Sequence, residues 1–370
     1  MFSSILLQVN AAAVTFAFNW GSLTQTYLDT QDSLSSIGTS YFELACFGEG
    51  DASEKNMFVA ETIIYILLPL VLIALTGTGV LLSAFFKSGK EPGDDILHKA
   101  KVSAVGVASI TLFLLQPTLV KQFALLFSCI RMGTNDNDVF FLEDLRIRCY
   151  SKDHIQRLFG LGLPLLGLYV IGIPLAMYKL LSHPTSLGMI RDITQADQME
   201  RKAKIDDLES IRAASAARTH LDAPTQAFKN SYAFLFLGYR PELYLWEIAV
   251  LARKGGLSLI GVAFSTDPRM QVMLGLLVIF VCAVAHARFM PFDDALMNTY
   301  EFISLSASAM TFFIGVFTMD NEDDTTTELA SALAFVVNML FVVSAVPIGL
   351  RVKKIASRSK NIQKVQNLLA

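Results

Sequence analysis

Charged residues are scarce in this 370-residue chain: Lys, Arg, Asp and Glu together make up 17% of it, whereas hydrophobic residues make up 53%. A soluble domain is usually about one quarter charged. The shortage is concentrated in uncharged stretches of about twenty residues, the length of a helix that crosses a hydrocarbon core about 30 Å thick. The composition therefore excludes an ordinary soluble globular protein and indicates a membrane protein.

Cysteine, histidine and the signatures of catalytic sites are also sparse. Four cysteines are too few for a disulfide scaffold, and the five histidines are scattered, without the HExxH spacing of a zinc enzyme. The sequence contains no GxSxG or Walker-type loop, and no apolar segment near the C-terminus holds the lysine that a retinal needs. Basic residues lie beside apolar segments and form no nucleic-acid-binding patch. We therefore expect no enzyme, metal site, cofactor or nucleic-acid partner.

What the chain does contain is a series of apolar runs long enough to cross a bilayer. The first run is interrupted by Gln8 and Asn10, and a signal peptide is its rival interpretation; residues 1–10 contain no Lys or Arg, which favours a membrane helix. We predict an all-α, polytopic transmembrane bundle of seven to eight helices. The runs are Ile5–Trp20, Val59–Phe86, Val102–Ile130, Leu158–Leu181, Glu242–Phe264, Gln271–Ala287, Met297–Phe317 and Leu329–Leu350.

The distribution of basic residues predicts the orientation of this bundle. With the C-terminus placed in the cytosol and the sides alternated backwards, the inner segments hold nineteen Lys and Arg and the outer segments hold six. Cytosolic segments of membrane proteins carry such an excess. The last outer loop, 318–328, has acids and no base, and the tail after Leu350 has six basic residues and no acid. We therefore predict a cytosolic C-terminus.

The same pattern divides the chain into five parts. They are a weak first helix with an outer segment (1–56), a first helical group with an outer cysteine-containing loop (57–181), a cytosolic charged linker helix (182–241), a second group of four helices (242–350) and a basic cytosolic tail (351–370).

The centre of the linker, Asp192–Arg218, is rich in helix formers and charges and contains no Pro or Gly. This composition predicts a solvated helix. A weak apolar stripe on it offers a contact for a partner, but a charged helix lying under the bundle is the favoured interpretation. The stripe consists of Ile190, Ile193, Met199, Ile205, Leu208 and Ile211.

Several short blocks follow one another along the chain in a recognisable order. They are QVNAAAVTFAFNW at 8–20, Leu-Ala-Cys ending at Cys46, Phe-Ser-Cys ending at Cys129, LEDLRIRC at 142–149, IGIPL at 171–175, LGYRPELYLWE at 237–247, Arg253-Lys254, Met-Pro-Phe at 290–292 and Asn-Thr-Tyr-Glu at 298–301. The ordered series resembles the transient-receptor-potential-like (TRP-like) C-terminal transmembrane domains found in fungi and in large surface proteins of protists. No single block is diagnostic, but together they cover nearly the whole chain. The resemblance implies a channel-like protein, and the chain looks like a short or truncated member because an ectodomain often precedes this region.

Three of the four cysteines fall on the predicted outer side of the membrane, where the environment is oxidising. These are Cys46, Cys129 and Cys149, and we favour a disulfide over free thiols. Two pairings stay open: Cys129–Cys149 pins the loop after the third apolar run, whereas Cys46–Cys149 ties the first outer segment to that loop. Cys282 lies within an apolar run and is expected to pack as a small apolar residue.

Arg253 and Lys254 fall near the middle of the fifth apolar run. A cation at the bilayer centre costs about 2.5–3.5 kcal/mol, so buried partners or water are expected. In one interpretation these residues line a polar cavity or hold a lipid headgroup. In the other, Glu242–Ala252 lies along the inner interface, with Tyr244 and Trp246 as anchors. The sequence leaves both interpretations open.

One face of the helix that starts at Met297 is polar. Spacings of three and four place its members on one side of the helix. Such a face turns toward the bundle interior, where it lines an ion or solute path or packs against neighbouring helices. A pair between Glu301 and Arg253 or Lys254 accounts for both buried charges at once. The members of the face are Asn298, Glu301, Ser304, Ser308 and Thr311.

Three functions are compatible with this sequence. The TRP-like resemblance implies cation transport or its modulation. The alternatives are a carrier or lipid-binding protein, in which Arg253 and Lys254 hold an anionic group, and a membrane anchor bundle of a larger surface protein without transport. The expected partners are the lipid bilayer of the plasma membrane or an endomembrane, and a homo-oligomer or larger membrane complex.

Overall fold

The structure is a computed structural model, and it describes most of the chain from Trp20 to Ser344. The described residues are 16, 18, 20–35, 57–88, 94–132, 138–202, 213, 216–217, 221–264, 266–319, 325–344 and 350. The predicted first helix therefore lies almost wholly outside the described residues, as do Cys46, the acidic stretch 320–324 and the basic tail.

Helices make up most of the described chain, in agreement with the predicted all-α class. The α-helices are α2 (Ser22–Ser35), α4 (Met57–Ser88), α5 (Asp94–Leu125), α6 (Lys152–Arg157), α7 (Gly172–Ser182), α8 (Pro184–Lys202), α10 (Ala223–Tyr232), α11 (Trp246–Ala263), α12 (Pro268–Phe289), α13 (Ala295–Val316) and a last helix, Thr325–Ser344. Shorter elements are two π-helical turns (Leu158–Gly162 and Leu165–Val170), two 3-10 turns (Ala233–Leu235 and Pro241–Leu243) and the strands β1 (Cys129–Arg131), β2 (Val139–Phe141) and β3 (Asp144–Arg148).

Six helices in the described part of the chain are long and apolar enough to cross a membrane. They are Phe58–Val80, Leu97–Leu125, Lys152–Ser182, Pro268–Phe289, Ala295–Val316 and Thr325–Ser344. The predicted polytopic bundle is confirmed, and the chain is a multi-pass membrane protein. Helix α11 belongs to the same bundle, but its Glu247, Arg253 and Lys254 make it less apolar than the other six.

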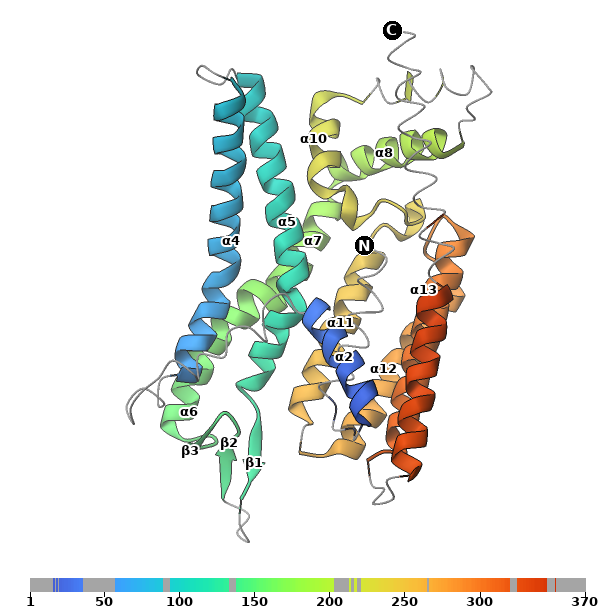
Figure 1. Cartoon of the computed structure of the whole chain (residues 1–370). Coiled ribbons are helices and arrows are strands. Elements are labelled where there is room, and N and C mark those ends of the chain that lie inside the picture. The colour runs from blue at the N-terminus through green and yellow to red at the C-terminus, as the bar shows by residue number, and fades with distance from the viewer. Residues whose placement is uncertain are drawn as a thin grey trace.

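The bundle consists of two groups of helices that meet along α5 and α11 (Figure 1). The first group contains α4, α5 and the Lys152–Ser182 span, and its core includes Leu119, Leu165 and Leu251. The second contains α11, α12, α13 and the last helix, with Leu257, Ile279 and Phe312 in its core. Because α11 contributes to both cores, it is the element that joins the two groups.

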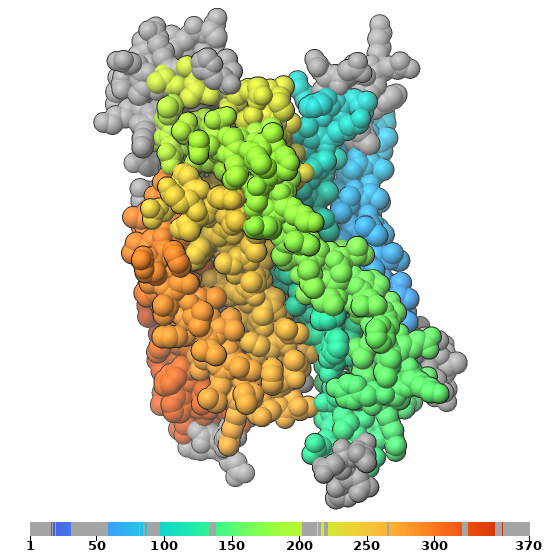
Figure 2. All heavy atoms as spheres, turned by 180° about the vertical axis from the view of Figure 1, so that it is seen from behind, coloured from blue at the N-terminus to red at the C-terminus, as the bar shows by residue number. Residues whose placement is uncertain are grey.

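Segments predicted to face the cytosol gather at one end of this bundle (Figure 1). The C-terminal end of α4, the N-terminal end of α5, α8 and α10 lie at the top of the view, whereas α6, the three strands and the α11–α12 connection lie at the bottom. Helix α8 runs across the inner end, and Figure 2 shows how the Lys152–Ser182 span reaches it diagonally from the outer end. This arrangement agrees with the sides assigned from the basic residues.

The structure corrects several predicted boundaries. The linker helix begins at Pro184 rather than Asp192, because proline is well suited to the first helical position. The first two residues of its apolar stripe, Ile190 and Ile193, are buried against the bundle rather than free for a partner, whereas Met199 is exposed. The remaining stripe residues lie outside the described part. The fifth run is helical only from Trp246, since Pro241 starts a separate 3-10 turn.

The outer loop after α5 is more ordered than predicted. Helix α5 runs through Pro117 and ends at Leu125, so the predicted helix to Ile130 is too long. The chain then forms an antiparallel sheet in the order β1-β2-β3, with Phe140 and Phe141 in the central strand. The chain turns at Leu126 and Phe127, and Cys129–Arg131 then pairs with Val139–Phe141 instead of continuing the helix.

The Lys152–Ser182 span is bent by its two π-helical turns. At Gly172 an added Cβ would lie 2.5 Å from the backbone oxygen of Gly167, so the bend requires a glycine there. Kinks of membrane helices are commonly caused by such π-bulges and by proline.

Candidate functional site: a buried charge cluster around helix α11

Helix α11 carries three charged side chains that are all buried. Glu247, Arg253 and Lys254 are 4%, 6% and 6% exposed, respectively. Consecutive residues of a helix point about 100° apart, so Arg253 and Lys254 face different neighbours. Arg253 faces α13 in the second group, whereas Lys254 faces Phe113 of α5 in the first group. Helix α11 is continuous from Trp246 to Ala263, and Arg253 is buried inside the bundle rather than exposed at its edge.

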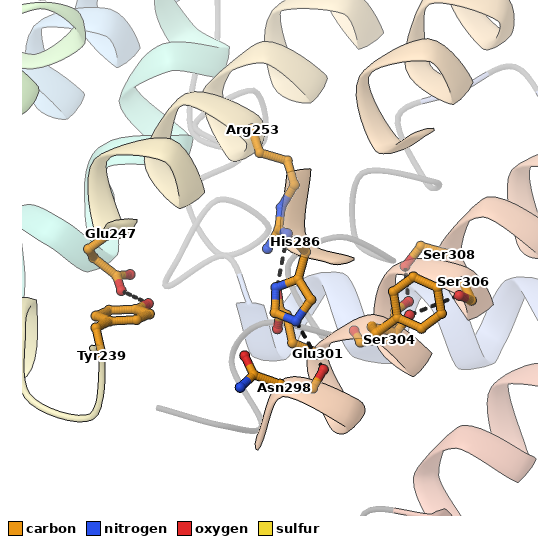
Figure 3. A network of polar contacts seen from close by, with 10 residues as sticks. Tyr239, Glu247, Arg253, His286, Asn298, Glu301, Ser304, Ser306 and Ser308 are labelled. Carbon is orange, nitrogen blue, oxygen red and sulfur yellow. Dashed lines mark hydrogen bonds and ion pairs between the residues drawn. The ribbon is translucent and has the colours of Figure 1, made fainter. Parts of the chain in front are cut away.

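Arg253 forms an ion pair with Glu301 of α13 (Figure 3). Its Nη1 donates to Glu301 Oε1 at 2.9 Å, and both side chains are almost fully buried. The remaining polar atoms of the pair, Arg253 Nε and Nη2 and Glu301 Oε2, have no hydrogen-bond partner among the residues that the structure describes. A buried polar atom without a partner costs about 1–3 kcal/mol. Of the five polar side-chain atoms that the pair brings into the bundle, two are therefore hydrogen-bonded and three have no partner in the described chain.

His286 of α12 lies beside this ion pair (Figure 3). Its Nε2 is 2.9 Å from the backbone oxygen of Asn298, which can only accept, so Nε2 carries the hydrogen. In the neutral ring Nδ1 is then an acceptor, and this buried atom has no partner in the described chain. The ring packs against Trp246, with 6.3 Å between the ring centroids.

Glu247 and Lys254 form the other side of the cluster. The Tyr239 hydroxyl donates to Glu247 Oε2, and burial together with the Glu247 carboxylate raises the pKa of Tyr239, so the hydroxyl keeps its proton. Lys254 lies two helical turns from Glu247 on the same side of α11. Its Nζ is 5.2 Å from the centroid of the Phe113 ring, a cation–π contact.

The residues at the two ends of the predicted polar face of α13 have structural roles, and the residues at its centre remain candidates for function. Ser308 Oγ donates to the Ser304 carbonyl at 3.0 Å, and Thr311 Oγ1 donates to the Ala307 carbonyl at 2.9 Å. Thr311 Oγ1 also accepts from Asn338 Nδ2 of the last helix at 2.9 Å, which joins two helices. The hydroxyls of Ser308 and Thr311 are thus used in packing.

At the other end of the face, Asn298 holds the turn between α12 and α13. Its Oδ1 accepts from the Phe292 N–H at 3.0 Å, and its Nδ2 donates to the Phe292 carbonyl at 2.8 Å. Only Glu301 and Ser304 remain as the centre of the face. Ser304 is 1% exposed, and its Oγ has no partner within the described ranges.

The sequence analysis missed His286, Glu247 and Tyr239 as members of the cluster. An ionisable residue inside an apolar run is a usable signal, because such residues are rare in membrane helices. His286 and Glu247 both carry that signal, whereas Tyr239 precedes the helix and only the fold brings it close.

At the outer end, a disulfide joins Cys129 and Cys149, the first of the two pairings considered. The free thiol of Cys282 is half-buried in α12. The ligand atoms of Cys129, Cys149 and His154 lie within 4.8 Å of one another, as in a metal site. The sulfurs are joined to each other, however, and His154 Nδ1 accepts from the Tyr150 N–H while Nε2 contacts the Leu126 carbonyl oxygen. These atoms are therefore occupied and do not suit a metal.

No family model, curated protein or solved structure matches this chain.

Proposed function

We propose that this chain is a membrane transport protein of the TRP-like type, in which an ion or small solute crosses through the second helix group. The observation that carries the proposal is the set of unpaired polar atoms on Arg253, Glu301, His286 and Ser304. These side chains come from three helices, α11, α12 and α13; Figure 3 shows Arg253, His286 and Glu301 close together, and Ser304 follows Glu301 by one turn of α13. Intramembrane ionisable residues of this kind commonly mark substrate or ion pathways.

The state seen here is closed around the cluster. Each of these polar atoms is sealed from solvent and lacks a partner in the described part of the chain. A rearrangement that hydrates them recovers the hydrogen bonds that they lack, and this gain offsets part of the cost of opening the bundle. Gated transport of an ion or solute requires a closed and an open arrangement of the same helices.

A second candidate function, a membrane anchor bundle without transport, is favoured by the hydroxyls of Ser308 and Thr311. Both are satisfied within the bundle, and Thr311 joins α13 to the last helix. In that case Arg253 and Glu301 only hold helices together.

The two candidates differ in a flux measurement. The protein is reconstituted into vesicles, and ion currents and solute flux are recorded for the wild type, Glu301→Gln and a matched control, Glu328→Gln, whose side chain is exposed on the last helix. We expect wild-type flux that Glu301→Gln lowers at least about tenfold, the effect of about 1.4 kcal/mol on a barrier, while the control keeps it. Absence of any flux from the wild type would contradict the proposal and support the anchor.

A further inference from the structure

The ion pair leaves one particular edge of the Arg253 guanidinium free. Glu301 takes Nη1, whereas Nε and Nη2 are buried and have no partner among the described residues. The N–H groups on Nε and Nη2 lie parallel and match the two oxygens of a carboxylate or phosphate. Arg253 therefore presents, inside the bundle, the bidentate edge that recognises an oxyanion.

The cluster contains further buried polar atoms that have no partner among the described residues. The Ser304 hydroxyl lies one helical turn from Glu301 and is able to donate to an anion. His286 Nδ1 and Glu301 Oε2 are acceptors, and neither has a partner in the described part of the chain. The cluster thus has unused donors for an oxyanion and unused acceptors for a proton.

The charges of the cluster explain why both ligands are needed. Arg253 and Lys254 are balanced by Glu247 and Glu301, so an added anion leaves the buried cluster with one negative charge. An uncompensated buried charge is strongly unfavourable. A proton on His286 Nδ1 or Glu301 Oε2 restores neutrality.

The groups around His286 belong to three elements. They are Trp246 and Arg253 of α11, Cys282 one turn away on its own helix α12, and Asn298 and Glu301 of α13. Among these, the Asn298 carbonyl and the Glu301 carboxylate favour a protonated imidazole, whereas Arg253 opposes it. An anion bound at the free edge of Arg253 offsets that opposition, so each ligand promotes binding of the other.

We infer that the cluster formed by Arg253, His286 and Glu301 binds a small oxyanion, a carboxylate or a phosphate group, together with one proton. The inference rests on the proposed function, because the closed cluster must become reachable for the anion to enter. It also departs from the cation expected from the TRP-like resemblance. The oxyanion is either a free solute or the headgroup of a lipid.

Tryptophan fluorescence provides a direct test. The chain has two tryptophans, and Trp20→Phe leaves Trp246, beside His286, as the reporter. The protein is placed in phosphatidylcholine nanodiscs and titrated with acetate or inorganic phosphate at about pH 5.5 and about pH 8, on either side of the ordinary histidine pKa. In a second arm the nanodiscs contain phosphatidic acid. We expect a saturable change in one arm, at least about tenfold tighter at the lower pH.

Three variants identify the residues involved. Arg253→Lys keeps the charge but loses the bidentate edge, and we expect at least about tenfold weaker binding. His286→Gln keeps a donor to Asn298 and should remove the pH dependence. Ser304→Ala removes a hydroxyl without a described partner, so it should fold normally and weaken binding at least about tenfold, the contribution of a hydrogen bond to a charged group. Arg288→Lys, at an exposed position of α12, is the control and should bind as the parent does.

Some outcomes would overturn the inference. These are no response to acetate, phosphate or phosphatidic acid at either pH, equal affinity at both pH values, or Arg253→Lys and Ser304→Ala both behaving as Arg288→Lys. Binding without any flux leaves the inference standing and removes transport from the proposed function. Flux without binding of either oxyanion contradicts the inference and leaves the proposed transport function standing.

Discussion

The buried pair of Arg253 and Glu301 makes each residue costly to replace alone. A single Arg253→Glu or Glu301→Arg change leaves two like charges inside the bundle, and breaking a buried pair typically costs about 3–5 kcal/mol. Reversing both restores an ion pair between α11 and α13. We expect the single variants to lose most of the folded protein, and the double variant to recover it, in thermal unfolding followed by size-exclusion chromatography in detergent.

Arg288→Glu is the control for this experiment, because Arg288 is an exposed cation of the neighbouring helix α12. It should unfold like the wild type. If the double variant is no more stable than the single ones, the two side chains do not stabilise the bundle as a pair.

Tyr239 gives the cluster a dependence on alkaline pH. Burial and the Glu247 carboxylate raise the pKa of Tyr239, so the folded chain retains a proton that the unfolded chain releases above about pH 10. The folded state then binds more protons than the unfolded state, and stability falls as the pH rises beyond that point. Tyr239→Phe should lower stability at neutral pH by about 1.5–3 kcal/mol, because Glu247 loses its hydrogen-bond donor. When the pH is raised to 11, the variant should lose less stability than the wild type, because it lacks the ionising hydroxyl. Unfolding temperatures measured against pH check this, and parallel curves for the two proteins would exclude it.

Among the elements, the N-terminal segment has a structural role in the second helix group. Phe16 and Phe18 are buried, with ring centroids 4.6 and 5.7 Å from that of Phe312. They lie directly on two glycines: an added Cβ would meet Phe16 at 2.8 Å from Gly275 and Phe18 at 2.5 Å from Gly315. Small residues in membrane helices permit such close approach. Gly275 and Gly315 therefore provide the space in which the rings of Phe16 and Phe18 pack.

Alanine at Gly315 should displace Phe18 and destabilise the bundle by about 1–3 kcal/mol, as overpacking does. Gly79→Ala is the matched control, because an added Cβ on that helix of the first group meets nothing within 4 Å. It should be neutral or stabilise its helix by up to about 1 kcal/mol. Thermal unfolding of the two variants in detergent measures the difference. Equal stability of the two would mean that Phe18 moves aside freely.

The elements also show what the sequence can and cannot predict. Apolar runs of membrane length were sufficient to predict that the helices exist, because helices and closed barrels are the structures that span a bilayer. The ends of the helices were predicted less well: α5 ends at Leu125, just before strand β1, and α8 starts at Pro184 within a polar linker. Among the site residues, Glu301 and Arg253 are conspicuous as charges in apolar runs. Their pairing, the free edge of Arg253 and the contact between Tyr239 and Glu247 depend on side-chain directions that periodicity does not specify.

At the scale of the whole molecule, the two ends of the bundle carry different structural elements. The end predicted to face the cytosol is covered by α8, whose Gln198 Nε2 reaches Asp293 Oδ1 at the α12–α13 turn at 3.5 Å, so this helix contacts both groups. The outer end carries the β1–β3 sheet with its disulfide. A shift of one group against the other about α11 therefore has to move α8 as well, which makes α8 the inner element best placed to influence the charge cluster.

The sidedness of the whole bundle can be tested by labelling. A single cysteine is introduced either at Arg148, an exposed residue of β3, or at Arg191, an exposed residue of α8. Both changes replace an exposed arginine, so they are matched. Cys46→Ser and Cys282→Ser are included in both, because these are the two native cysteines outside the disulfide between Cys129 and Cys149. In intact cells a membrane-impermeant maleimide should label Arg148→Cys only, and permeabilisation should expose Arg191→Cys, because the excess of Lys and Arg on the α8 side retains that side in the cytosol. Labelling of Arg191→Cys in intact cells would show that the bundle has the opposite orientation, with α8 outside and the disulfide in the cytosol.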